Sequence, residues 1–228
     1  MKEQLYLSWS GGKDSALALF ELSQSEKYEV AGLLTAITKE YERISMHGVR
    51  VSLLEQQAGA LDLPLKKIFI TKNATNDEYD SAMAKACDEI KKEGITSVAF
   101  GDIFLEDLKL YREKNLAKVG MQAVFPLWKI PTKELVEEFL SNNFQAITVT
   151  CDPRKLSEHY VGRRMDKDFF DSLPADVDPC GENGEYHSFV YNSPNFSSMI
   201  PIKIGEKVLR DGFWFYDILP LATEMTSL

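Results

Sequence analysis

The 228-residue sequence is short of the features that mark membrane, secreted and nucleic-acid-binding proteins. It contains no apolar run of the ~18 residues that a membrane-spanning helix needs, which excludes a helical span. The opening stretch MKEQLYLSW leads into a strand pattern without the apolar core or cleavage site of a signal peptide. We therefore expect a cytoplasmic protein without a membrane partner.

Basic residues and cysteines are also few. The 26 Lys and Arg residues stand against 35 Asp and Glu, a formal net charge of −9. This balance argues against a broad basic face for nucleic acid, although it allows a local pocket for a small phosphate. Cys87, Cys151 and Cys180 form no CxxC pair and no metal-ligand cluster, which predicts buried or idle thiols in a reducing compartment.

Strand and helix patterns alternate through the first half of the chain. Strand patterns fall at residues 5–9, 28–38, 65–70, 97–102 and 123–128, and helical spacing falls between them at 15–23, 51–61, 75–94 and 105–119. Such alternation is typical of βαβ units. The sequence therefore predicts an α/β fold with a Rossmann-like parallel sheet and helices on both faces.

The pattern changes between Pro126 and Pro131, where we place a domain boundary that divides residues 1–128 from a smaller α+β domain, 129–228. In the second part Thr132 is expected to cap a helix to about Leu140, followed by a strand at 146–151 and a helix at 166–173. The acidic stretch DVDPCGENGEYHSF reads as irregular. The tail predicts short strands, with turns at 205–206 and 211–212.

The most informative stretch is LSWSGGKDSAL, where a strand turns into a helix. Two adjacent glycines let the backbone approach a ligand, and the free N–H groups of the first helical turn favour an anion. The lysine adds a positive charge and the serines add hydroxyl donors. The glycine spacing is not that of a Walker A loop, which separates its glycines and places Ser or Thr after the lysine. The residues of this phosphate-binding prediction are Ser10, Gly11, Gly12, Lys13, Asp14 and Ser15.

SGGKDS resembles the PP-loop of the ATP pyrophosphatases, which cut ATP between the α- and β-phosphates. The resemblance implies that residues 1–128 form a PP-loop ATP-binding domain and that Lys13 stabilises the departing pyrophosphate. A Mg²⁺ ion bridging the phosphates is expected with ATP. Asp14 is a candidate catalytic residue and metal ligand, or alternatively a helix cap.

Two later stretches resemble the diphthine–ammonia ligase family within this superfamily: FGDIFLEDLKLYREKNLAKVGMQAVFPLW and DPCGENGEYHSFVYNSPNF. The resemblance implies adenylation of a carboxylate, followed by displacement of AMP by ammonia to give an amide. The chain departs from archaeal and eukaryotic members at FLEDLKLYRE, where they carry a Tyr-Gln pair after GDI. The acceptor is therefore either diphthine, carried on a translation elongation factor, or another carboxylic acid.

The strand end Gly101-Asp102 lies at the same predicted sheet edge as the phosphate loop. Asp102 is a candidate for orienting a ribose, a metal or the nucleophile, or alternatively caps the next helix. Arg112 and Glu113 on that helix form ion pairs with neighbouring residues, reach a phosphate or, more commonly for such charges, form a solvated face. For the adenosine end, the resemblance points to the strand end at Ala36 and Ile37 and to His47 in the following loop.

The CGENGEYHSF segment is either a plain surface loop or the acceptor site, with residues 129–228 as the acceptor-binding domain. Glu182 and Glu185 are candidates for capturing ammonium and for catalysis. The substrate-binding candidates are Gly181, Glu182, Asn183, Gly184, Glu185, Tyr186 and His187.

Two other functions stay open for a chain of this kind. A tRNA-modifying enzyme would use the same loop to adenylate a base, although the acidic balance and isolated cysteines weigh against it. A nucleotide sensor without turnover would not need the complete Lys-Asp-Ser loop. The sequence does not decide the oligomeric state, for which a homodimer is one option.

Overall fold

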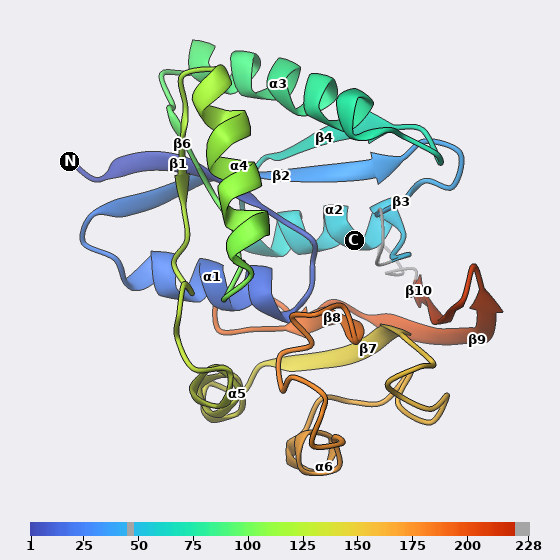
Figure 1. The fold of residues 1–228 in the computed structure, drawn as a ribbon. Coiled ribbons are helices and arrows are strands. Elements are labelled where there is room, and N and C mark those ends of the chain that lie inside the picture. Colours follow the sequence, from blue (N-terminus) through green and yellow to red (C-terminus); the bar gives the residue numbers. More distant parts are fainter. Residues whose placement is uncertain (45–47, 222–228) are drawn as a thin grey trace, which may run out of the picture.

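The computed structural model describes residues 1–44 and 48–221, and its strands form two sheets (Figure 1). β1 of sheet A pairs in parallel with β2 and β5, β4 pairs in parallel with β2, and β6 with β5. The short β3 runs antiparallel beside the end of β2. The predicted parallel sheet is confirmed. Its strands are β1 (Glu3–Ser8), β2 (Tyr28–Thr38), β3 (Arg43–Ile44), β4 (Leu65–Ile70), β5 (Ser97–Ala99) and β6 (Gln122–Val124).

The position of β1 between β2 and β5 creates a crevice at the carboxyl edge of sheet A. The chain leaves β1 towards β2 on one side and later returns to its other side through β5. The chain segments after β1 and β5 therefore lead to helices on opposite faces of the sheet, which marks the topological switch point where α/β sheets bind ligands.

Helices cover both faces of sheet A, as predicted. α1 (Lys13–Gln24) and α2 (Val51–Leu61) lie on one face, and α3 (Asn76–Lys92) and α4 (Glu106–Lys118) lie on the other (Figure 1). Side chains alternate across β1 accordingly. Leu5 and Leu7 join the core with α1 and α2, whereas Tyr6 joins the core with α3 and α4.

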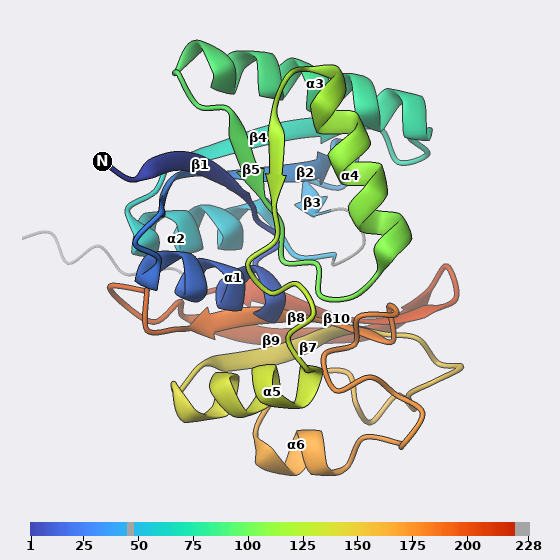
Figure 2. The ribbon, with the colours of Figure 1, turned by 60° about the vertical axis from the view of Figure 1, so that its left-hand side comes forward.

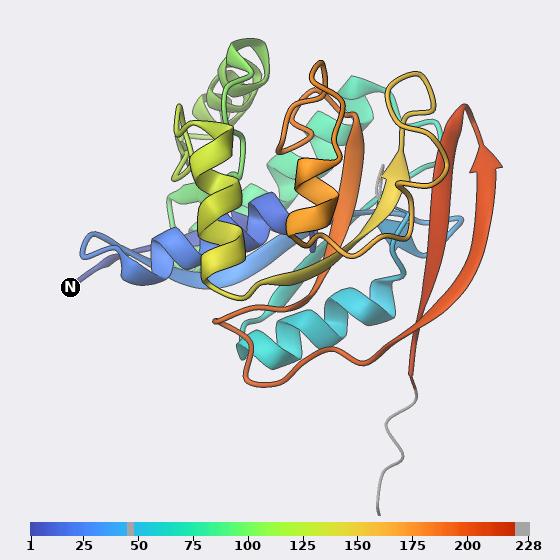
Figure 3. The ribbon, with the colours of Figure 1, turned by 90° about the horizontal axis from the view of Figure 1, so that it is seen from below.

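Sheet B packs against the α1 and α2 layer and carries α5 (Thr132–Ser141) and α6 (Lys167–Asp171) on its far side (Figure 2). It is antiparallel, in the order β8-β7-β10-β9, and the β9–β10 hairpin forms one edge of the molecule (Figure 3). Leu17 of α1 and Phe189 of β8 belong to one continuous core. The division at 128/129 remains a prediction. The strands are β7 (Gln145–Cys151), β8 (Tyr186–Asn192), β9 (Ile202–Arg210) and β10 (Phe213–Pro220).

The turn predicted at residues 205–206 is wrong, because β9 continues through both residues. The pairing with β10 shifts between Tyr216 and Ile218 at this point. A Cβ on Gly205 would lie 2.9 Å from the Asp217 carbonyl oxygen, so the glycine permits a bulge instead of a turn. The turn at 211–212 is confirmed, and both of its residues have positive φ.

Three smaller predictions also need correction. Pro131, and not Thr132, is the N-cap residue of α5. The strand expected at 123–128 ends at Val124 because the chain then turns towards α5. The end of the predicted irregular stretch DVDPCGENGEYHSF is a strand, since β8 begins at Tyr186 and pairs along β7. The irregular segment is therefore shorter than expected.

Candidate active site

The loop predicted to bind phosphate joins β1 to α1 at the carboxyl edge of sheet A. Gly11 has a φ of +74°, and a Cβ there would lie 2.6 Å from Gln57 Oε1. The buried Gln57 amide donates to the carbonyl oxygens of Gly11, at 3.1 Å, and Val190, at 2.6 Å. The Lys13 N–H donates to Ser188 Oγ at 3.0 Å. The loop is thus fixed by α2 on one side and by β8 on the other.

The Lys13 ammonium group is buried at the base of this loop, with only 3% of the residue exposed. Nζ lies 2.5 Å from Asp14 Oδ1 and 5.5 Å from the centroid of the Tyr186 ring. Burial lowers the pKa of Lys13, but nearby anions, chiefly the Asp14 carboxylate, raise it above its ordinary value. The side chain therefore keeps the positive charge that a phosphate site requires.

Asp14 lies in the first turn of α1, and the N-cap residue is Gly12, so the capping alternative for Asp14 is wrong. Burial raises the pKa of Asp14, and its ion pair with Lys13 opposes that rise. Within residues 1–44 and 48–221, no three His, Cys, Asp or Glu side chains are arranged to hold a metal ion. Asp14 still fits Mg²⁺, since that ion is commonly held by one or two carboxylates together with substrate phosphates.

The loop after β5 carries a buried ion pair into the same crevice. Arg112 of α4 donates from Nε to Asp102 Oδ2 at 2.5 Å and from Nη2 to Oδ1 at 3.2 Å. Its guanidinium carbon lies 4.4 Å from the centroid of the Phe100 ring. Burial lowers the pKa of Arg112, but Asp102 raises it above its ordinary value, so the guanidinium stays charged. Leu105 is the N-cap of α4, which excludes that role for Asp102.

The surface-helix alternative for Arg112 is also wrong, since its side chain is 19% exposed and paired with Asp102. The adjacent Gly101 explains how the two loops come together. A Cβ on Gly101 would lie 2.9 Å from the backbone of Asp14, so the β5 loop packs directly against the start of α1. A side chain at residue 101 would separate the ion pair from the phosphate loop.

The segment from Asp178 to Glu185 folds on itself through its own carboxylates. Glu185, which is 3% exposed, accepts hydrogen bonds from the N–H groups of Asp178 and Asn183 and from the Asn183 side-chain amide. Asp178 accepts from the N–H groups of Cys180 and Glu182 at 3.0 and 3.1 Å. The segment is a preformed support, and its Glu185 carboxylate is directed inward.

Glu182, by contrast, reaches across the crevice to the loop after β5. Its Oε1 accepts a hydrogen bond from the Ile103 N–H at 2.7 Å. Burial raises the pKa of Glu182 to about 7, and the carboxylates of Asp14 and Asp102 add to the rise. Its protonation state therefore changes near neutral pH, where a general acid or base is most effective.

These groups surround one cleft of about 230 Å³. It brings together most of the residues predicted for phosphate, catalysis and acceptor, which come from three separate segments. The predicted residues Gly11, Asn183 and Glu185 do not line it. The predicted residues that line it are Ser10, Gly12, Lys13, Asp14, Ser15, Gly101, Asp102, Gly181, Glu182, Gly184, Tyr186 and His187.

A second cavity of about 370 Å³ adjoins the cleft and shares His187 with it. Thr38, at the end of β2, lines it together with Phe213 and Phe215 of β10. Neither Ala36 nor Ile37, which were predicted to contact adenine, lines either the cleft or this cavity. The prediction for His47 lies outside the described residues.

Three lining residues of the cleft were not named from the sequence: Ser8, Phe100 and Ser188. Arg112 was named only with alternatives, as a residue that reaches a phosphate or lies on a solvated face. Strand alternation from Tyr186 would have placed Ser188 on the same face, but only if β8 had been recognised. Ser8 and Phe100 adjoin the two strand ends that were identified. For Arg112, nothing in the neighbouring sequence distinguishes a buried charged side chain on a helix from a solvated one.

Comparison with known proteins identifies the family of the chain. The diphthamide synthase N-terminal domain matches residues 3–123, and the diphthamide synthase C-terminal domain matches residues 131–220. The chain belongs to the diphthamide synthase family. The family resemblance inferred from the sequence is therefore confirmed over most of the chain. No helix within the described ranges has the length and apolar character to span a membrane.

Curated proteins that are similar to this chain carry the name diphthine–ammonia ligase. The protein from Bos taurus is 29% identical over 228 residues, covering 87% of this chain and 82% of the relative. The protein from Homo sapiens is 24% identical over 230 residues, covering 88% and 83%. The Schizosaccharomyces pombe protein is 24% identical over 222 residues, which is 87% of this chain but 36% of that longer relative.

Proposed function

We propose that this chain is an ATP-dependent amide ligase that adenylates a carboxylate and lets ammonia displace AMP. The observation that carries the proposal is the meeting of Lys13, Arg112 and Glu182 around one cleft. A buried ammonium, a buried guanidinium and a carboxyl group with a pKa of about 7 are the charges that this two-step reaction needs. The names of the relatives support the same reaction class.

In the first step the triphosphate of ATP lies in the loop from Ser10 to Ser15. A carboxylate oxygen of the acceptor attacks the α-phosphorus, and the bond from that phosphorus to the pyrophosphate oxygen breaks. Pyrophosphate departs with the electron pair, and Lys13 with the backbone N–H groups of the first turn of α1 stabilises the developing charge. Adenosine extends towards the cavity bounded by Thr38 and Phe215, which has the lining residue His187 in common with the cleft.

Arg112 is the residue best suited to hold the acceptor carboxylate. Its guanidinium is fixed by Asp102 on one side and by the Phe100 ring on the other, so little conformational freedom is lost on binding. Asp102 is then a positioning residue that acts through Arg112. The Mg²⁺ ion that accompanies ATP would be held by Asp14 and the phosphates, and would supply Lewis-acid stabilisation there.

In the second step the nitrogen of ammonia attacks the acyl carbon of the mixed anhydride. The bond between that carbon and the phosphate oxygen breaks, and AMP leaves with the electron pair. The surplus proton on nitrogen passes to the ionised Glu182 carboxylate. Glu185 supports this loop through its three internal hydrogen bonds and takes no direct part.

A screen for AMP and pyrophosphate formation tests this function. The protein is incubated with ATP, magnesium and ammonium chloride, and with either a diphthine-bearing elongation factor or a panel of small carboxylic acids. We expect pyrophosphate release that depends on one acceptor, and an amide product from it. ATP binding without pyrophosphate release for every acceptor would contradict the proposal and favour a nucleotide sensor.

A further inference from the structure

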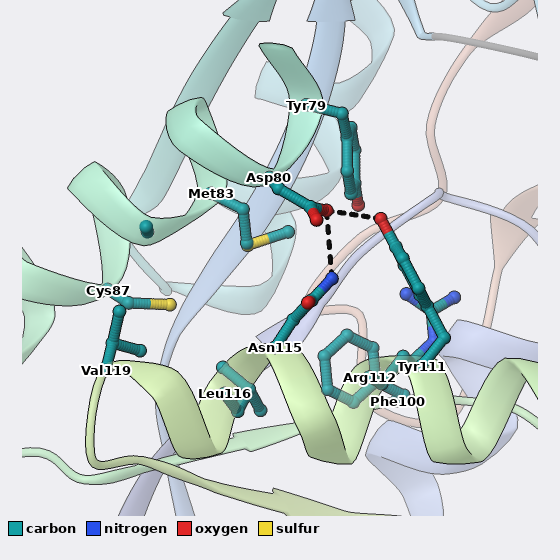
Figure 4. A pocket seen from close by; sticks show the side chains of 11 residues that line it. Tyr79, Asp80, Met83, Cys87, Phe100, Tyr111, Arg112, Asn115, Leu116 and Val119 are labelled. Carbon is teal, nitrogen blue, oxygen red and sulfur yellow. Dashed lines mark hydrogen bonds between the residues drawn. The ribbon is translucent and has the colours of Figure 1, made fainter. Parts of the chain in front are cut away.

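A small chamber of about 30 Å³ lies between α3 and α4, on the side of sheet A away from the phosphate loop (Figure 4). Its interior is apolar. The side chains of Met83 and Cys87 point into it from α3, and those of Leu116 and Val119 lie along its floor. A space of this size accommodates one or two molecules as large as water or ammonia.

One end of the chamber carries a polar rim. Asp80 accepts hydrogen bonds from the Tyr111 hydroxyl and from Asn115 Nδ2, the latter at 2.9 Å, and the ring of Tyr79 lies beside them (Figure 4). A carboxylate at the mouth of the chamber is a suitable environment for a small cation, because its negative charge attracts it.

The inner wall of the chamber is shared with the cleft. Phe100 and Arg112 line both spaces, and the guanidinium stacks on the ring between them. A molecule that passes this partition therefore arrives beside Asp102 and Glu182, where the proposed amide bond forms. The proposed mechanism gives this chamber no other role.

We propose that this chamber is the ammonia entry site of the ligase, an inference that rests on the proposed function. Ammonium is attracted to Asp80, loses its proton to water at the rim, and neutral ammonia enters the apolar interior. A cation would lose its hydration there without compensation, so the interior favours the neutral molecule. Ammonia then crosses this partition when the Phe100 ring moves off the guanidinium that Asp102 holds in place, and reaches the acyl carbon away from the water that would hydrolyse the intermediate.

Filling the chamber tests this route. Ala84 lines the chamber from α3, and Ala84→Leu occupies its space without adding charge. Ala117→Leu makes the same change on the exposed face of α4 and is the matched control. Adenylation is measured as acceptor-dependent exchange of pyrophosphate into ATP without ammonium, and amidation as AMP formation at rising ammonium chloride. The acceptor is the one found by the pyrophosphate screen.

We expect Ala84→Leu to raise the KM for ammonium at least fivefold while the exchange rate stays within twofold of the unaltered protein. Ala117→Leu should change neither quantity by more than twofold. Asp80→Asn keeps the shape of the rim and should raise the ammonium KM severalfold. An unchanged ammonium KM in both Ala84→Leu and Asp80→Asn would overturn the entry site while leaving the ligase intact. Absence of exchange in the unaltered protein would overturn the ligase and the entry site together.

A second measurement needs no acceptor. The side-chain amide of Asn115 donates to Asp80, so its ¹H–¹⁵N signals report on the rim. They should shift in a saturable way with ammonium chloride and not with sodium chloride at equal ionic strength, and Asp80→Asn should abolish that difference. Equal responses to the two salts in the unaltered protein would overturn ammonium binding at this site.

Discussion

The backbone N–H of Lys13 donates a hydrogen bond to Ser188 Oγ at 3.0 Å, across 175 positions of sequence. The first turn of α1, which is proposed to bind the phosphates of ATP, is therefore positioned by a strand of sheet B. Gln57 adds a second connection, from α2 to the carbonyl oxygens of Gly11 and Val190. The geometry of the loop depends on both halves of the chain.

Removing the serine hydroxyl should weaken nucleotide binding. Ser188→Ala leaves the Lys13 N–H without its buried acceptor, a loss of about 1 kcal/mol, or roughly a fivefold change in equilibrium. We expect the Kd for ATP to rise by about that factor in isothermal titration calorimetry. Ser193→Ala is the control, because the buried Ser193 hydroxyl has no partner within the described residues. Equal effects of the two substitutions would contradict the positioning role of Ser188.

Lys13→Ala should slow adenylation far more than it weakens ATP binding. The ammonium group stabilises charge that develops on departing pyrophosphate, and loss of one such donor typically costs about 10²–10³ in rate. Acceptor-dependent exchange of pyrophosphate into ATP measures this step. Lys27→Ala removes an exposed ammonium group that lies 4.6 Å from the centroid of the Tyr28 ring. This control should leave the exchange rate unchanged. Normal exchange in Lys13→Ala would disprove the assignment of the loop.

The raised pKa of Glu182 predicts a pH-dependent stability. Between its ordinary value of 4.5 and about 7, the folded chain holds a proton on this carboxyl that the unfolded chain has lost. The free energy of unfolding should therefore fall as pH rises through this window, and level off above it. Glu182→Gln should remove that part of the slope in urea titrations at several pH values. Glu138, whose pKa is also about 7, contributes equally to both proteins.

The same group should shape the pH profile of amidation. The Glu182 carboxylate accepts a proton only when ionised, so the rate should rise through about pH 7. Glu182→Gln should lower the amidation rate and lose this inflection, while its exchange of pyrophosphate into ATP continues. A retained inflection near pH 7 in the variant would assign the proton acceptor elsewhere.

Two glycine substitutions should have opposite effects on stability. A Cβ at Gly101 would lie 2.9 Å from the Asp14 backbone, so Gly101→Ala must displace the start of α1 and should lower both Tm and ATP affinity. Gly59 lies within α2 with open space around its Cβ position, so Gly59→Ala should stabilise the fold by about 0.5–1 kcal/mol. Thermal unfolding monitored by circular dichroism compares them. A lower Tm for Gly59→Ala would contradict the predicted contrast.

The cysteine thiols should be unreactive in the folded protein. All three are buried, and burial raises the pKa of Cys87 to about 11 and those of Cys151 and Cys180 to about 12. Because the thiolate is the reactive form, iodoacetamide should modify them only after denaturation. Mass spectrometry of native and urea-treated samples measures the extent of labelling. Rapid native labelling of Cys180 would show that the loop opens readily.

Much of the fold and the phosphate loop was predictable because both depend on local patterns. Alternating strands and helices specify a parallel sheet, and the edge that binds ligands follows from strand direction. The positions of Gly11 and Lys13 at the strand-to-helix turn also follow from residue type and local pattern, whereas their phosphate-binding role stays a prediction. The confirmed prediction of buried thiols likewise needed only the absence of paired cysteines.

The remaining features depend on contacts between distant segments. Arg112 belongs to a helix rich in charge, and only the approach of Asp102 and Phe100 distinguishes it from its solvated neighbours. Gly205 has the residue type of a turn, yet the course of β10 converts it into a bulge. In the sequence Glu185 has the character of an exposed acidic residue, but in the structure it is buried by its own loop. Sequence spacing does not record these tertiary contacts.

The Lys13–Ser188 bond also has a consequence for synthesis on the ribosome. The loop proposed to bind ATP leaves the exit tunnel early, but the strand that positions it follows some 175 residues later. A nascent chain therefore carries the loop residues long before Ser188 is available to hold the Lys13 N–H. The proposed nucleotide site would become complete only after β8 has been synthesised.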